Sequence, residues 1–125
     1  MQFAPDKCKL LRITRKTPRL TIHAKYSIRG EELETVTEAK YLGVTLDSKL
    51  TFNAHINKTV KKANSSLQFI QRNLRGCNPT VKSSAYRTYV RPIAEYASAV
   101  WDPNTRNADQ VKRVESIQRK ACLLY

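Results

Sequence analysis

The chain has 125 residues, enough for one modest hydrophobic core. Its 41% hydrophobic and 26% charged residues are ordinary for a globular protein, and no window has the apolar length of a membrane span. Lysine and arginine number 23 against 10 acidic residues, so the net charge of +13 favours a polyanionic partner, nucleic acid before an anionic membrane. A basic protein without such a partner is the plainer alternative.

The first part of the chain predicts three or four short strands between about residues 8 and 46. Cys8 to Thr14 forms the first strand, and a hairpin follows in which Gly30 takes a positive φ. Because the connections are short, one small antiparallel sheet is the simplest arrangement. Such a sheet needs a helical layer to cover it.

The stretch from Thr35 to Leu46 predicts the last strand, because its apolar residues alternate with period two. Gly43 lies inside this predicted strand, which indicates either a β-bulge or a close approach by another backbone or a ligand. Asp47-Ser48 then ends the run.

Apolar residues recur every three or four positions in the rest of the chain, which predicts three helices at about 53–75, 79–100 and 106–124. Pro92 should kink or interrupt the second helix near Tyr89 to Arg91. The first apolar stripe is Ile56, Val60, Ala63, Leu67, Ile70 and Leu74. The second is Val81, Ala85, Tyr89, Ile93, Tyr96 and Val100, and the third is Val111, Val114, Ile117, Ala121 and Leu124.

These patterns together predict an α+β fold, with a small antiparallel sheet followed by a three-helix bundle. We expect a β region over 1–52 and a helical region over 53–125, packed as one compact unit. The last helix still has apolar residues where the chain stops at Tyr125, so we expect a truncated chain.

The first predicted helix carries its cations on the face opposite the apolar stripe. These residues are Lys58, Lys61, Lys62 and Arg72, and Ser65 and Phe69 share their face. Such a face can lie along a phosphate backbone, although a solvated face is the common alternative. The basic residues of the other two helices, Arg87, Arg91, Lys112, Arg113, Arg119 and Lys120, are weaker cases.

The residues do not predict a catalytic or metal site. His23 and His55 lie in different segments without metal-ligand spacing, and there is no glycine-rich phosphate loop. The three cysteines, Cys8, Cys77 and Cys122, are far apart and form no CxxC pair, which predicts buried thiols in a reduced, intracellular protein. Tyr86, Tyr89, Tyr96 and Trp101 can stack on bases, but their helical spacing favours core positions.

Five phrases of the sequence occur together in one known family. They are FAPDKCKLLRIT, KYLGVTLDSKLTFNAHI, KANSSLQFIQRNLR, YRTYVRPIAEYASAVWDP and VESIQRKA. In this order and at these intervals they resemble the reverse transcriptase of non-LTR (LINE-class, jockey-like) retrotransposons. The resemblance covers nearly the whole chain, but KACLLY at its end departs from the family pattern.

The resemblance implies a piece of a larger enzyme, in which Met1 is an internal methionine. Tyr41, Leu42 and Gly43 are similar to the primer-grip motif, where a strand turn holds the 3′ end of the primer. The helices that follow resemble the thumb, which binds the template–primer duplex, and the rest of the palm and fingers would be the protein partner. The family's catalytic aspartates and their Mg²⁺ ions belong to upstream motifs, so this chain is expected to be inactive alone and to hold no cofactor.

Two hypotheses follow. The first is a palm-edge and thumb piece of an RNA-directed DNA polymerase, which positions the primer and binds the duplex through phosphates. The second is an independent small basic helical module that binds nucleic acid or a protein. Neither predicts a membrane partner, and the choice between nucleus and cytoplasm stays open.

Overall fold

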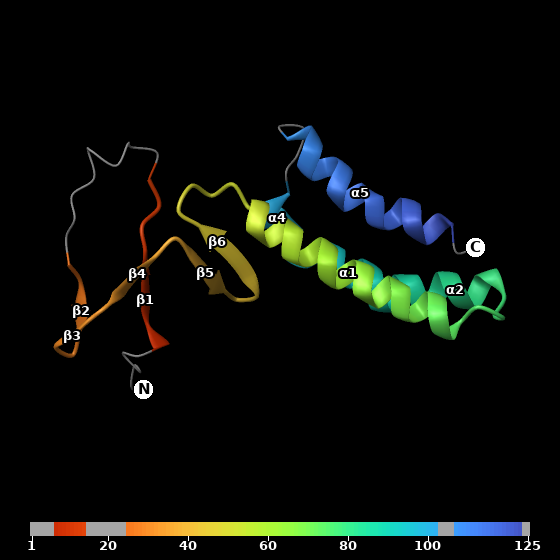
Figure 1. Cartoon of the computed structure of the whole chain (residues 1–125), viewed down its shortest axis with the longest axis horizontal. Helices are drawn as coiled ribbons and strands as arrows, with labels where there is room; N and C mark the ends of the chain where they lie inside the picture. Colours follow the sequence, from red (N-terminus) through yellow and green to blue (C-terminus); the bar gives the residue numbers. More distant parts are fainter. Residues whose placement is uncertain (1–6, 15–24, 103–106, 124–125) are drawn as a thin grey trace. The chain divides into compact units, whose positions relative to one another are not determined.

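The computed structural model describes residues 7–14, 25–102 and 107–123 of the chain. The chain divides into two compact units, Met1–Phe52 and Asn53–Tyr125. The described strands all lie in the first unit and the described α-helices all lie in the second (Figure 1). The predicted α+β class is therefore confirmed.

The first unit contains short strands that pair two by two. The strands are β1 (Lys9–Leu11), β2 (Ser27–Ile28), β3 (Glu31–Glu32), β4 (Glu34–Val36), β5 (Glu38–Tyr41) and β6 (Val44–Asp47). The pairs β2–β3 and β5–β6 are antiparallel, whereas β1 and β4 are parallel, with Leu10 opposite Thr35. The prediction of a single antiparallel sheet is wrong in this respect. Residues 12–33 separate the parallel strands, which gives the chain enough length to return in the same direction.

The predicted last strand, Thr35 to Leu46, is divided among β4, β5 and β6. Tyr41 pairs with Val44 across a two-residue turn in which Leu42 has φ 48° and Gly43 has φ 83°. Two successive positive φ values match the type I′ turn that suits the twist of a hairpin. Gly43 therefore lies in a turn, and the prediction that it lies inside a strand is wrong.

The β2–β3 turn has the same construction, with φ 55° at Arg29 and φ 80° at Gly30. This hairpin and its glycine conformation are confirmed. The end of β6 at Asp47 is confirmed as well. The Asp47 carboxylate accepts hydrogen bonds from the backbone N–H of Thr51, at 2.8 Å, and from the Thr51 hydroxyl.

The second unit is built around α1 (Asn53–Asn73), a helix of 21 residues that confirms the first predicted helix. The chain continues through α2 (Pro79–Ala85), the π-helix η3 (Tyr86–Val90), α3 (Arg91–Glu95), α4 (Ser98–Trp101) and α5 (Ala108–Cys122). Helix α1 packs against η3, α3 and α5. The buried cluster of this unit is Ala63, Leu67, Ile70, Val90, Ile117 and Ala121, and Val60 and Leu74 pack on it.

The second predicted helix is interrupted just before Pro92, as expected. The N–H of Arg91 donates to the carbonyl of Tyr86, five residues earlier, and Pro92 has no N–H to offer the next carbonyl. The carbonyl of Tyr89, within η3, accepts a hydrogen bond from the Ser66 hydroxyl of α1 at 3.1 Å. This hydrogen bond joins the π turn to the neighbouring helix.

The π turn also changes which residues face the core, because it places one additional residue in a turn. Val90 is fully buried, whereas the predicted core residue Tyr89 is 64% exposed. Further along, Trp101 is buried and Val100 is exposed. The predicted core positions of Val81, Tyr89, Tyr96 and Val100 are therefore wrong. The wider turn of η3 displaces Tyr89, and Tyr96 and Val100 lie on either side of the chain turn at Ala97, whereas Ala85 and Ile93 pack on the cluster as predicted. Tyr86 is half-buried and packs on the cluster as expected.

The chain turns sharply after α3, where Ala97 has φ 52°. The short helix α4 that follows brings the Trp101 ring against His55 of α1, with ring centroids 5.5 Å apart. The indole N–H of Trp101 donates to the carbonyl of Tyr96 at 2.6 Å. Trp101 therefore stabilises the turn after α3 through its indole N–H, and its ring also packs against the beginning of α1.

Helix α5 begins after Asn107, whose side chain accepts a hydrogen bond from the N–H of Gln110. Ile117 and Ala121 are buried as predicted, while Leu124 and residue 106 lie outside the described residues. The prediction of three buried thiols is wrong, because Cys122 is exposed on the last turn of α5, where only one side of the helix is covered.

Candidate nucleic-acid interface

The four cations predicted on α1 lie on one exposed face. Lys58, Lys61 and Lys62 follow one another at helical spacing, and all of them are exposed. Arg72 lies eleven positions after Lys61. That separation corresponds to about 16 Å along the axis and about 20° around it. The positive charge therefore forms a stripe, which we call the α1 cationic face (Lys58, Lys61, Lys62 and Arg72).

The charge of this face is not compensated within its own helix. No aspartate or glutamate occurs between Asn53 and Asn73. In the described parts of the chain, the four cations form no ion pair, whereas Arg91 pairs with Glu95 at 2.6 Å and Arg119 with Glu115 at 3.3 Å. Arg113 also pairs with Asp109. The cations of α3 and α5 are thus partly neutralised at i,i+4, and those of α1 are available to an external anion.

The surface between the lysines and Arg72 carries small and polar side chains together with one aromatic ring. Ser65 and Gln68 are exposed, and the Phe69 side chain is 61% exposed. Small polar residues let a phosphate backbone approach, and an exposed ring offers a surface for a base or a sugar. The arrangement suits contact with a polyanion of any sequence.

His55 lies at the beginning of α1 but does not belong to this face. Its ring is buried, its Nε2 lies 3.4 Å from the Thr59 hydroxyl, and it contacts the Trp101 ring. Burial lowers the pKa of His55 below 6.5, and the charge of Lys58 lowers this pKa further. A neutral, packed histidine fits a structural role.

The primer-grip-like residues lie at the tip of the β5–β6 hairpin. Tyr41 ends β5, and Leu42 and Gly43 form the turn. The side chains of Tyr41 and Leu42 are 65% and 75% exposed. The tip of the hairpin thus exposes two apolar side chains to solvent. Leu42 also has a left-handed backbone conformation that leucine rarely adopts.

The described residues offer no site for a metal ion. Within 7–14, 25–102 and 107–123, no group of three or more His, Cys, Asp or Glu side chains lies close enough to hold one. The four glutamates of the hairpin region, Glu31, Glu32, Glu34 and Glu38, are all exposed, as expected. These residues do not fit the Mg²⁺ that the family resemblance implies for the whole enzyme, and we assign no metal-dependent step to them.

Near the end of α1 lie two further cations that were not predicted as site residues from the sequence. Arg75 follows Arg72 by three positions, and Lys82 lies in α2. Both line a cavity of about 270 Å³ together with Ile70, Gln71, Leu74 and Leu123. Arg75 could have been predicted from the sequence, because it follows Arg72 at helical spacing. Lys82 could not, because only the fold brings it near the end of α1.

No helix in the described residues is long and apolar enough to cross a membrane.

The chain resembles the reverse transcriptase of a non-LTR retrotransposon, and comparison with known proteins confirms this resemblance. A matching protein from Drosophila melanogaster is described as a probable RNA-directed DNA polymerase from transposon BS. The two are 29% identical over 103 residues, which are 80% of this chain and 11% of the relative. The chain thus spans about a tenth of the relative's length. No family model and no solved structure matches.

Proposed function

We propose that this chain is the part of a retrotransposon RNA-directed DNA polymerase that binds the template–primer duplex and positions the primer. The similarity to a transposon polymerase supports the parent enzyme. The uncompensated α1 cationic face is the observation that carries the duplex-binding role. Phosphate contacts bind a duplex irrespective of its sequence, which is what a polymerase needs as it moves along a template.

The β5–β6 turn would contact the primer. Tyr41 and Leu42 are exposed at its tip, so their apolar side chains can pack against a sugar or a terminal base. The positive φ of Leu42 is a strained conformation for leucine, and such strain is often found where a side chain has a binding role. The catalytic carboxylates and the metal ions would be supplied by the rest of the enzyme.

A salt titration of duplex binding tests this role. If the four cations each neutralise one phosphate, the logarithm of the affinity for a blunt RNA–DNA duplex should fall against the logarithm of salt with a slope of about −3.6. Replacing Lys61, Lys62 and Arg72 by glutamine should make that slope shallower by about 2.7 and weaken binding at low salt. Lys58 is left in place because it also affects His55.

A matched control removes the same charge elsewhere. Lys49, Lys112 and Lys120 are exposed and lie outside α1, so their replacement by glutamine should change the slope much less. An affinity that does not change with salt, or equal changes of slope in the two triple variants, would count against the α1 cationic face as the duplex-binding surface. If the slopes change equally and the unchanged chain still binds duplex strongly, the alternative of a general basic module is favoured.

A further inference from the structure

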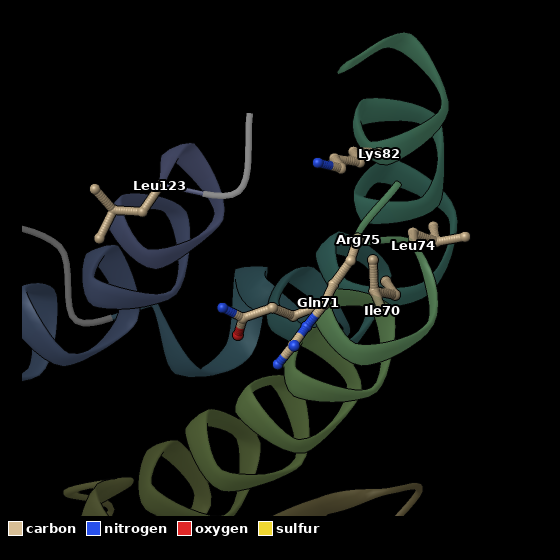
Figure 2. A pocket seen from close by; sticks show the side chains of 6 residues that line it. All are labelled: Ile70, Gln71, Leu74, Arg75, Lys82 and Leu123. Carbon is tan, nitrogen blue, oxygen red and sulfur yellow. The ribbon is translucent and has the colours of Figure 1, made fainter. Parts of the chain in front are cut away.

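The cavity at the end of α1 combines apolar walls with two cations. Figure 2 shows the polar ends of Gln71, Arg75 and Lys82 extending to the side on which the end of α5 carries Leu123. Ile70 and Leu74 of the α1 end contribute apolar surface. Its volume of about 270 Å³ is just below the range, roughly 300–1,000 Å³, of pockets for drug-sized ligands. A ligand of about one nucleotide is therefore the appropriate size.

The charges of the cavity select an anion. The six residues that line it include two cations and no acidic residue. Neither Arg75 nor Lys82 forms an ion pair in the part of the chain that the structure describes, although Lys82 is half-buried. An incoming phosphate can therefore form charge-assisted hydrogen bonds with Arg75 and Lys82 without competing with a carboxylate among the lining residues.

The cavity lies around the end of α1 from the α1 cationic face. Its apolar residues Ile70 and Leu74 belong to the stripe opposite that face, and Arg75, three positions after Arg72, is the lining cation nearest to the face in sequence. A nucleotide therefore reaches the cavity only by leaving the duplex at the end of the face. An apolar pocket with an amide group suits a base that has left the helical stack, because apolar side chains contact its faces and the Gln71 amide can bond its edge.

We propose, building on the duplex-binding role above, that this cavity holds one unpaired nucleotide at the end of the bound duplex. Arg75 and Lys82 bind its phosphate, and Leu123 contacts the base. The site gives the chain a preference for a duplex with an unpaired end over a blunt one. An acidic peptide is the competing occupant and is a possible outcome of the test below.

The test compares a blunt RNA–DNA duplex with the same duplex carrying one unpaired nucleotide at an end, using the full 125-residue chain at fixed salt. The overhang should tighten binding roughly tenfold. Leu123→Ser and Lys82→Gln should each reduce this preference to about twofold or less while the folded helical signal is kept, because Leu123 is 86% exposed and Lys82 is only half-buried. Lys112→Gln removes the same charge on α5 and should leave the preference intact.

The absence of any overhang preference, or its persistence in both pocket variants, would overturn the proposal. A second experiment distinguishes failure of the cavity proposal from failure of the duplex-binding role. Adenosine monophosphate and, in parallel, an acidic peptide are titrated into the chain while NMR follows the Gln71 side-chain amide and the Leu123 methyl groups. Shifts with the nucleotide that Lys82→Gln abolishes support the cavity even if duplex is not bound. Shifts with the peptide alone, or with neither probe, overturn it.

Discussion

At the scale of single residues, His55 is a buried ionisable side chain with a direct effect on stability. Its ring lies between the first turn of α1 and the Trp101 ring, and Thr59 is its hydrogen-bonding neighbour. Burial, and then the charge of Lys58, lowers its pKa from 6.5. The neutral ring is therefore the form that the folded helical unit accommodates.

This lowered pKa predicts a loss of stability as the pH falls below about 6.5. In that range the unfolded chain binds a proton at His55 and the folded chain does not, so protonation favours unfolding. Above pH 6.5 the contribution is fully present. Thermal unfolding between pH 7.5 and pH 5.5 should show a smaller decrease for His55→Gln than for the unchanged chain. Parallel decreases would argue against a titrating His55, since His23 is kept in both proteins.

At the scale of elements, the β5–β6 hairpin should gain stability when its strained residue is replaced. Leu42 has φ 48° and is followed by glycine, and Asn-Gly is a preferred pair for a type I′ turn. Leu42→Asn should stabilise the hairpin by about 1 kcal/mol, which amide hydrogen exchange in β5 and β6 would measure. Leu42→Ala keeps the unfavourable conformation and should give no gain. Unchanged or faster exchange in Leu42→Asn would contradict the turn.

The helices could be predicted from the sequence because their signals are local. The stripe from Ile56 to Leu74 has an unbroken helical period, and the end of the helix is marked by Gly76 and the next start by Asn78-Pro79. The asparagine indeed caps α2, since its side chain accepts a hydrogen bond from the Val81 N–H at 3.0 Å. The α1 cationic face follows from the same period, so its residues could be selected without a structure.

The strands and the second core stripe could not be predicted because their determinants are unusual or distant. Leu42 continues the apolar alternation, so nothing in the pattern reveals that it adopts a left-handed conformation in a turn. The parallel pairing of β1 with β4 joins segments far apart in the chain. Pro92 marks an interruption, but the sequence does not reveal whether the helix kinks or adds a π turn. In the structure the π turn buries Val90 and leaves Tyr89 exposed.

At the scale of the whole molecule, the helical unit contains its own core, whereas the described residues of the strand unit, 7–14 and 25–52, do not form a comparable one. Residues 60–121 supply every member of the main cluster and the residues packed on it. The strand unit consists of two-stranded pairs with mostly exposed or half-buried residues, and such pairs are marginal by themselves. The two units should therefore differ in independent stability.

We expect a chain of residues 53–125 to keep its helical circular dichroism and to unfold cooperatively with heat. Introducing a charge into the fully buried core position Ile117, as Ile117→Asp, should abolish the transition, with a cost of several kcal/mol. Exposed Gln118→Asp is the control and should change little. A gradual, non-cooperative loss of helix in the unchanged 53–125 chain would show that this unit depends on the residues before it.

The π-helix η3 has a consequence for how the protein tolerates changes in length. Its additional residue places Val90 in the core, so η3 is equivalent to a one-residue insertion within a helix. A copy that lacked one residue between Tyr86 and Val90 could wind as an ordinary α-helix and still present the same side chains to α1. Insertions and deletions usually accumulate in loops, whereas in this chain a helix next to the core provides room for one.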